Sequence, residues 1–435
     1  MRTLVISPFF PPLPDPQAIT TGKFVRALQE SGNSPQVIFC SNLRANPRPD
    51  GSKMWASLEP VRYDVPVLPS APLIERASNA LRYQMWTWSS WTRAVVAKAR
   101  ELHSQTPFDL VISRSLPHHG NIAGYWVACA LRVPWVPMFS DPWSLSPSFI
   151  NNHNERFISW KPSVGRKIWW RRIVARAQAV AFPSERLRRA CLQGALKQIQ
   201  ALVVPHIGAA VECLERTDKF VIVHSGIYGL NDATGRSALP LLDGMAEFFR
   251  QRPIARSRTR LVFVGPQDPQ TLQKAADCGI SETIVCTGLV DYEKSLRFIA
   301  DASLCVLIEG DMTEGIFLPS KLCDYISARK PVLALSPEIG TVADLGQDGG
   351  IRRVRPNDTA GVARALVEHF DAFMQGTLDL YAPPDSLVLR FEGKSVIRDF
   401  LDSFAWIPNR RVENIAEPVA TMRRAHRNLG QMISK

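Results

Sequence analysis

The chain alternates between short β-branched runs and longer segments with helical periodicity, in two separate series. The first series predicts strands at Thr3–Ser7, Gln36–Cys40, Leu110–Ser113, Trp135–Phe139, Ala179–Phe182 and Leu202–Val204. The second predicts strands at Phe220–His224, Leu261–Val264, Thr283–Cys286, Leu304–Ile308 and Val332–Leu335. Strands alternating with helices are typical of parallel α/β sheets with crossover connections. We therefore expect two doubly wound sheets, joined by a linker near residues 205–218.

The length of 435 residues agrees with two domains and a tail. We expect a first Rossmann-like domain over residues 1–205 and a second over 206–393. A helical tail, 394–435, should pack back across both. Because such sheets bind ligands at the carboxyl ends of their strands, two facing domains form a cleft between them. We expect the chemistry in that cleft.

Composition narrows the class of protein. A hydrophobic content of 46% against 21% charged residues is typical of a packed globular protein and argues against a disordered or fibrous one. The longest apolar stretch, residues 120–139, is interrupted by polar residues and prolines, so we expect no membrane span. Met1–Pro8 runs directly into a buried-strand pattern, without a basic segment, a long apolar core and a cleavage site, so we expect no secretory signal. The eight cysteines are scattered without a C-x-x-C pair, which favours reduced thiols in a cytoplasmic protein.

A first candidate site follows the first predicted strand. The run Thr20-Thr21-Gly22-Lys23 is expected to open a helix, and a helix N-terminus with a small residue can bind an anion. Thr20 or Thr21 could equally be a simple N-cap. No G-x-G-x-x-G motif is present, which counts against a dinucleotide-binding dehydrogenase.

Two further loops follow predicted strands of the first domain. His118 and His119 come after Leu110–Ser113, and Asp141 comes after Trp135–Phe139. Their position at strand carboxyl ends would let them reach the cleft as acid or base groups. Ordinary roles as cap or turn residues are the alternative.

The most specific segment lies in the second half, from Glu314 to Tyr325, followed by Lys330-Pro331-Val332. It predicts a loop and then a helix capped by Ser320, with Lys321 in the first turn and Asp324 one turn further. A carboxylate there can accept two ribose hydroxyls, and a lysine near a helix start can complement a diphosphate. Spacing alone favours an ordinary capped helix with an exposed Lys–Asp pair.

The run Pro319-Ser320-Lys321-Leu322, leading to Asp324 and then Lys-Pro-Val, resembles the donor-site helix of glycosyltransferase family 4, in particular its bacterial surface-polysaccharide branch. Further matches, in the same order along residues 1–360, are Phe9-Phe10-Pro11-Pro12, Pro134-Trp135, Asp141-Pro142-Trp143, Ser225-Gly226 and Thr287-Gly288. The chain departs from the family pattern at Arg329, where the family usually has glycine.

The resemblance implies a GT-B fold and a retaining, metal-independent transfer from a UDP- or GDP-linked sugar, without a cofactor. The second domain would hold the nucleotide, and the first mainly the acceptor. The donor-binding residues would be Thr21, Gly22, Ser225, Gly226, Arg236, Gly288, Pro319, Ser320, Lys321, Leu322 and Asp324.

Within that set, Arg236 and Lys321 are the candidates for gripping the diphosphate. Asp324 corresponds to the second acid of the family's E-x7-E motif, which binds the ribose. The first acid falls at Ile316, so Glu314 is the candidate substitute as a catalytic acid. His118 or His119 would match the first-domain histidine near the transferred sugar, and Asp141 completes the catalytic candidates.

A formal net charge of +12 indicates an anionic partner. Ten Arg and Lys residues and one acid lie between Arg156 and Arg189, with tryptophans interleaved. A basic amphipathic helix of this kind suits a peripheral contact with an anionic membrane at the inner face of the cell, and a lipid-linked glycan acceptor. The alternative is that its apolar stripe packs on the sheet. No nucleic-acid-binding module is recognisable, so we expect no nucleic acid.

Two other functions remain open from the sequence. A non-hydrolysing nucleotide-sugar epimerase would share the fold and the need for a diphosphate grip. A catalytically inactive GT-B scaffold is also compatible, because Ile316 replaces an acid of the family motif.

Overall fold

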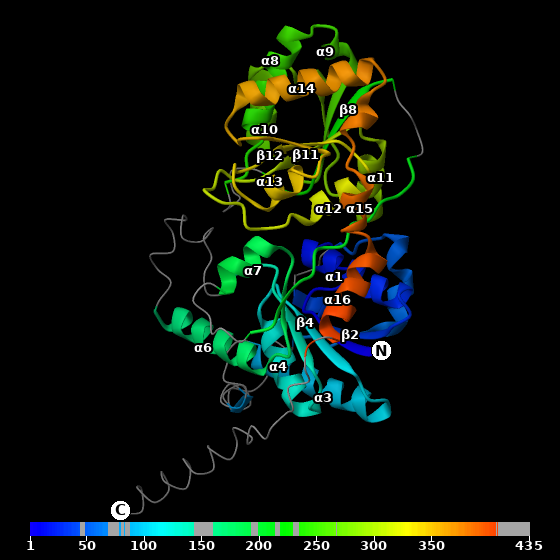
Figure 1. Ribbon diagram of the computed structural model, residues 1–435, viewed down its shortest axis with the longest axis vertical. Helices are drawn as coiled ribbons and strands as arrows, with labels where there is room; N and C mark the ends of the chain where they lie inside the picture. The colour runs from blue at the N-terminus through cyan, green and yellow to red at the C-terminus, as the bar shows by residue number, and fades with distance from the viewer. Residues whose placement is uncertain are drawn as a thin grey trace, which may run out of the picture.

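The computed structural model describes residues 1–43, 48–67, 78–79, 82, 88–142, 160–192, 199–213, 218–228, 235–266, 268–405 and 407. Figure 1 shows two α/β domains stacked along the long axis of the molecule, the first below and the second above. The two-domain fold predicted from the sequence is therefore confirmed.

In the described part of the first domain, seven parallel strands form one sheet. They are β1 (Arg2–Ile6), β2 (Ser34–Phe39), β3 (Arg62–Asp64), β4 (Leu110–Arg114), β5 (Trp135–Met138), β6 (Val180–Phe182) and β7 (Ala201–Val203). Their order is β3-β2-β1-β4-β5-β6-β7. Because the order reverses between β1 and β4, the carboxyl ends of these two strands border the crevice where such sheets bind ligands.

The described part of the second domain contains a six-stranded sheet. Its strands are β8 (Phe220–Ser225), β9 (Thr259–Val264), β10 (Ile284–Cys286), β11 (Leu304–Ile308), β12 (Val332–Leu335) and β13 (Ile351–Val354). The order is β10-β9-β8-β11-β12-β13, with every neighbouring pair parallel. The corresponding crevice lies at the carboxyl ends of β8 and β11.

Helices cover both sheets, as apolar strands that are buried on both faces require. Those before the second sheet are α1 (Pro16–Glu30), α3 (Ser89–Gln105), α4 (His119–Leu131), α6 (Trp160–Arg176) and α7 (Glu185–Leu192), with 3-10 turns η1 (Ser41–Leu43) and η2 (Lys53–Val61). The helices that follow β8 in the chain are α8 (Leu239–Gln251), α9 (Ala255–Arg258), α10 (Pro269–Asp277), α11 (Tyr292–Asp301), α12 (Ser320–Ser327), α13 (Thr341–Gly346), α14 (Thr359–Met374), α15 (Asp385–Leu389) and α16 (Gly393–Ala405), with the 3-10 turns η4 (Ser281–Thr283) and η5 (Leu378–Tyr381).

The last described helix, α16, crosses back from the second domain and lies beside α1 in the first (Figure 1). Phe400 of α16 meets Phe24 of α1 edge-on, with 6.0 Å between ring centroids. Ile397 is fully buried in the same contact region. The start of the expected tail therefore packs on the first domain, while residues 408–435 lie outside the described residues.

Two strands, β3 and β13, were not predicted. Both are edge strands, with the sequences RYD and IRRV. An edge strand has one free side, so it tolerates charged side chains and loses the apolar signature of a central strand. The hydrophobic pattern therefore missed them.

The predicted start of the first helix was wrong. Helix α1 begins at Pro16, and the Asp15 carboxylate accepts a hydrogen bond of 2.8 Å from the Gln17 backbone N–H. An N-cap aspartate followed by proline is a stronger start signal than a threonine pair. Thr20-Thr21-Gly22-Lys23 consequently lies inside the helix.

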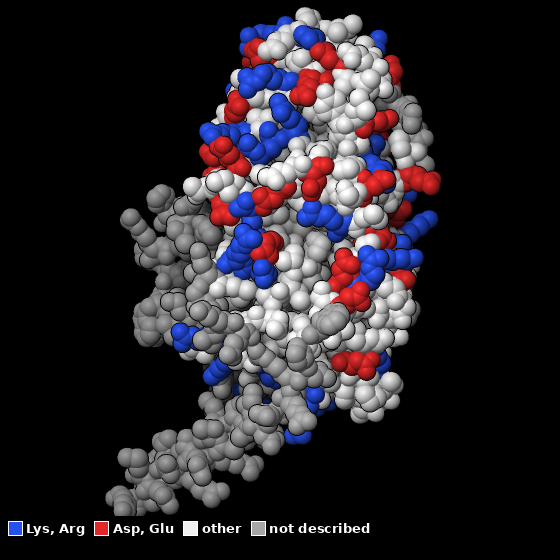
Figure 2. All heavy atoms as spheres, in the orientation of Figure 1, with Lys and Arg blue, Asp and Glu red and all other residues white. Residues whose placement is uncertain are grey.

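The basic segment from Arg156 to Arg189 is described only from residue 160, and its side chains only from 168. Trp169, Ile173 and Val174 are buried in the first-domain core, where Trp169 contacts Tyr125 edge-on at 5.5 Å. The apolar stripe thus packs on the protein, which is the alternative stated above. On the face shown in Figure 2, Lys and Arg lie among Asp and Glu. None of the described helices is long and apolar enough to cross a bilayer.

Candidate functional site

The two domains meet first through helices α1 and α12. Lys23 donates a hydrogen bond of 2.7 Å to Oδ1 of Asp324, and the two side chains are 2% and 7% exposed. The same Oδ1 accepts from the backbone N–H of Ala209 in the interdomain linker, at 2.9 Å. An acid predicted to bind ribose therefore lies, in this conformation, inside a domain contact.

A second contact caps helix α11 from the opposite domain. Oδ1 of Asp50 accepts from the Tyr292 N–H at 3.1 Å, and Oγ of Ser52 accepts from the Glu293 N–H at 2.9 Å. Trp55 stacks on the Tyr292 ring, with centroids 5.8 Å apart. Side chains of the first domain thus satisfy N–H groups that the first turn of α11 leaves free.

A third contact involves the loop before α12. Arg186 of α7 donates to Glu314 at 2.6 Å and to both oxygens of Asp344, at 2.5 and 2.7 Å. Glu314 is half exposed in this network. Its carboxylate joins the domains, so its geometry gives no support to the prediction that it replaces the missing catalytic acid.

Ile316, at the position of that missing acid, is 4% exposed and belongs to the hydrophobic cluster of the first domain. Its carbonyl accepts from the Ser184 hydroxyl at 2.7 Å and from the Thr341 hydroxyl at 3.1 Å. An apolar side chain suits this contact, since a carboxylate here would be buried without a partner.

Three glycines gather at the carboxyl ends of β8, β9 and β10. Gly226, Gly265 and Gly288 all have positive φ values, of 101°, 145° and 68°. Gly265 pairs with Gly288 through an isolated bridge, and a Cβ added to Gly265 would lie 2.9 Å from the Gly226 carbonyl oxygen. The predicted Gly226 and Gly288 are thus brought together by Gly265, which sequence reasoning missed. Glycines here allow a ligand to approach the backbone closely.

Lys321 reaches the same place from the first turn of α12. Its Nζ lies 3.5 Å from Nε2 of His224. A Cβ added to Gly226 would lie 2.7 Å from the same Nζ. Burial, then the Lys321 charge, hold the pKa of His224 well below its usual value. The imidazole is therefore neutral beside a cation. Pro319 occupies the N-cap position, so the prediction that Ser320 caps α12 was wrong.

Sequence reasoning missed an acid at the end of β11, the strand that pairs with β8. Glu309 directly follows the fully buried strand β11 and is 7% exposed. Its Oε2 accepts from the Ser336 hydroxyl at 2.7 Å. Burial raises the pKa of Glu309 to about 7, although Ser336 and the charge of Arg236 act in the opposite direction. An acid immediately after an apolar strand at the reversal of strand order was the available signal.

The predicted first-domain residues lie at strand ends as expected. His119 stacks on Trp88, with centroids 4.9 Å apart, and burial lowers the pKa of His119 to about 4. Burial raises the pKa of Asp141 to about 6. His118 precedes α4, and its ring lies 6.1 Å from that of Phe139. Both pKa shifts have the same cause, because burial disfavours the charged form of an imidazole and of a carboxyl alike.

Three predicted donor-binding residues make packing contacts in this structure. The Thr21 hydroxyl donates to the Gln17 carbonyl at 2.7 Å inside α1. Gly22 faces Pro11 and Trp55 so closely that an added Cβ would clash with both, at 2.6 and 2.8 Å. Leu322 is fully buried in the core. None of the three presents a group to the second-domain cluster through these contacts.

Comparison with known proteins supports the architecture. No protein-family model and no curated protein matches the chain. Among solved structures, sucrose-phosphate synthase from Thermosynechococcus elongatus is similar with a TM-score of 0.58 and 13% identity, covering 93% of this chain and 98% of that one. A UDP-GlcNAc 2-epimerase from Neisseria meningitidis, bound to UDP-GlcNAc, is similar with a TM-score of 0.56 and 12% identity, covering 93% of this chain and 100% of that one.

A third similar structure, the apo form of the lipopolysaccharide outer core galactosyltransferase WaaB, gives a TM-score of 0.54 and 12% identity, covering 93% of this chain and 99% of that one. All three likenesses extend over both domains. The chain accordingly has the two-domain GT-B fold that these proteins share.

Proposed function

We propose that the chain is a retaining, metal-independent glycosyltransferase that moves a sugar from a UDP- or GDP-linked donor to a lipid-linked glycan acceptor in bacterial polysaccharide biosynthesis. The observation that carries the proposal is the cluster of Lys321, Gly226, Gly265 and Gly288 at the crevice of the second sheet. Backbone at glycines and a nearby cation suit a diphosphate.

Each described group has a role in this proposal. Lys321 neutralises charge on the departing diphosphate, and Arg236, whose charge acts on both His224 and Glu309, adds to the positive field. Fixed cations of this kind stabilise a leaving group without a metal ion. Ser225 belongs to the same edge, where its backbone N–H donates to the Tyr325 hydroxyl at 2.9 Å.

Glu309 takes the place that the family motif assigns to an acid at position 316. It is buried beside Gly315, where an added Cβ would lie 3.6 Å from Oε2, so its carboxyl lies at the start of the motif segment. With a pKa near neutrality it can hold or release a proton next to the donor sugar. His119 and Asp141 are the groups proposed on the acceptor side.

The test is a thermal-shift and transfer assay with a panel of nucleotide sugars, UDP and GDP in EDTA. One nucleotide should raise the Tm in proportion to the logarithm of its concentration over Kd. Lys321→Ala should lose most of that shift and the transfer activity, whereas Lys294→Ala, an exposed lysine of α11, should keep both. An unchanged response in Lys321→Ala would remove Lys321 from the donor site.

An epimerase is the second candidate, because UDP-GlcNAc 2-epimerases are among the similar structures. Incubating each nucleotide sugar with the protein and no acceptor separates the two. A transferase leaves the sugar configuration unchanged, while an epimerase converts it. Binding without either reaction would favour a scaffold.

A further inference from the structure

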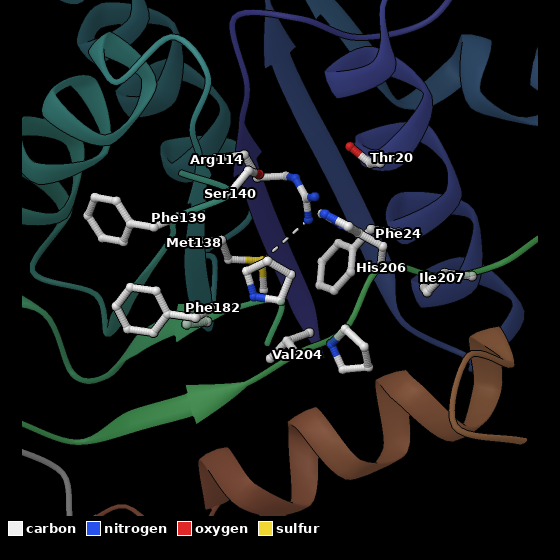
Figure 3. Close-up of a pocket in the computed structure, with 13 residues that line it drawn as sticks. Thr20, Phe24, Arg114, Met138, Phe139, Ser140, Phe182, Val204, His206 and Ile207 are labelled. Atoms are coloured by element: carbon white, nitrogen blue, oxygen red, sulfur yellow. Dashed lines mark hydrogen bonds between the residues drawn. The ribbon is translucent and has the colours of Figure 1, made fainter. Parts of the chain in front are cut away.

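A small cavity opens in the first domain, away from the second-domain cluster. It lies at the carboxyl ends of β4, β5 and β6, and Thr20, Arg114, Met138, Ser140, Phe182 and His206 are among its lining residues (Figure 3). Its volume of about 20 Å³ accommodates one water-sized group. The lining residues belong to the first domain and to the start of the linker, with none from the donor cluster.

Arg114, the last residue of β4, is the unusual feature of this cavity. The residue is 6% exposed, yet no ion pair to its guanidinium is formed among the described residues. Its Nε is buried and lacks a hydrogen-bond partner in that part of the chain. Nη1 donates weakly to the Met138 sulfur at 3.4 Å, and the guanidinium lies 5.2 Å from the centre of the Phe24 ring.

A buried guanidinium with these partners is poorly compensated. Arginine carries five donors in a planar fork and is almost never buried unless an anion pairs with it. A thioether and an aromatic face replace only part of the water that the cation loses. Burial accordingly lowers the pKa of Arg114 to about 10.

The groups around the cavity leave the charge of Arg114 uncompensated. His206 and Arg114 point toward one another across the cavity (Figure 3). Burial, then the charges of Arg114 and Lys23, lower the pKa of His206 to about 3, so it adds no second charge and can accept or donate as a neutral ring. The Ser140 hydroxyl donates to Gln17 at 3.1 Å at the rim. None of the described residues that line the cavity is acidic.

We propose that this cavity is a subsite for an oxyanion, a phosphate or a carboxylate, carried by the sugar acceptor. The guanidinium fork suits two oxygens of such a group, and one oxygen fits the cavity itself. The acceptor is assigned because every lining residue lies in the first domain or at the linker start, whereas the donor cluster is built on the second sheet. This assignment rests on the proposed transferase function.

The test compares the Tm of Arg114→Met with the Tm of the wild type, with and without added anions. In anion-poor buffer the substitution removes an uncompensated charge, so the Tm should rise. The wild-type Tm should climb with inorganic phosphate or with acetate at constant ionic strength, and Arg114→Met should not respond. Arg100→Met, an exposed arginine of α3, is the matched control and should behave like the wild type. A fall in the Tm of Arg114→Met, with no anion response in the wild type, would overturn the proposal.

Two further arms assign the anion. Phosphate alone raising the Tm identifies a phosphorylated acceptor, and acetate alone identifies an acidic sugar. The phosphate response should persist in Lys321→Ala and in saturating UDP or GDP, because the donor cluster is separate. Loss of the response under either condition would place the anion at the donor site and reject the acceptor subsite. Failure of the transferase proposal shows differently, as absence of any nucleotide-dependent shift in both the wild type and Arg114→Met.

Discussion

Lys23 and Asp324 are 301 residues apart in sequence and form a buried ion pair of 2.7 Å across the domain interface. The pair, together with the Asp50 and Ser52 contacts to α11, holds the domains against each other. Because Asp324 is enclosed there, a ribose could reach its carboxylate only if α1 and α12 separate. The predicted ribose role of Asp324 therefore stays a prediction, tied to an opening of the interface.

Removing one partner of this pair should destabilise the protein strongly. Lys23→Met leaves the buried Asp324 carboxylate without its cation, with the Ala209 N–H and the Tyr292 side chain beside it, which costs about 3–5 kcal/mol. Thermal unfolding should show a large fall in Tm, and the double variant Lys23→Met/Asp324→Leu should recover most of it. Arg26→Met, on the same helix with an exposed pair to Glu30, should change the stability by about 0.5 kcal/mol or less. Equal effects of the two single variants would contradict the buried contact.

Glu309 should make stability depend on pH. Its folded pKa of about 7 lies above the ordinary 4.5, so the stability from the protonated form is complete below about pH 4.5 and is lost as pH rises through 7. Glu309→Gln stays neutral, so its stability relative to the wild type should rise over this range, by on the order of 2–3 kcal/mol at pH 8. Denaturant unfolding at pH 5 and pH 8 measures the difference. Glu101→Gln, on the exposed side of α3, should follow the wild type, and a flat difference for Glu309→Gln would mean that its carboxyl is solvated.

Restoring the family acid should damage this protein. Ile316→Glu places a carboxylate in the hydrophobic cluster of the first domain, at an expected cost of roughly 2–5 kcal/mol. Ile339→Glu, at a residue that is 54% exposed, should change stability by within about 0.5 kcal/mol. Thermal unfolding of the two variants and the wild type measures these changes in stability. A stable Ile316→Glu protein with higher transfer activity would show that position 316 still faces the donor.

Gly226 can be tested separately from Lys321. Gly226→Ala forces a Cβ onto φ +101° and against the Lys321 ammonium, so it should cost about 1–2 kcal/mol and also weaken nucleotide binding. Gly279→Ala imposes a similar backbone strain at φ +65°, with no neighbour within 4 Å. Only the first variant should lose the nucleotide-dependent Tm shift. Equal nucleotide shifts in both variants would separate Gly226 from the donor site.

Much of the fold and part of the site follow from local sequence. Central strands are marked by uninterrupted apolar runs, and the Pro319–Leu322 segment does form the start of a helix. Arg329 shows how the structure accommodates a residue that departs from the family pattern. It adopts the left-handed φ of 54° just after α12, where the family usually has glycine, and its side chain pairs with Asp385 at 2.5 Å.

The sequence by itself determined two parallel sheets and their crevices, because hydrophobic periodicity and chain order are local properties. It also determined which segments place Lys321, Gly226, His119 and Asp141 near strand ends. Tertiary structure alone decided which charges are buried and what faces them. Lys23 could not be matched to Asp324, which lies 301 residues away in sequence. Glu309 and Arg114 could not be distinguished from surface residues, because burial depends on packing between segments that are not adjacent in sequence. Burial makes Lys23 and Asp324 a contact between the domains. It also underlies the proposed roles of Glu309 as a proton-holding acid and of Arg114 in an anion subsite.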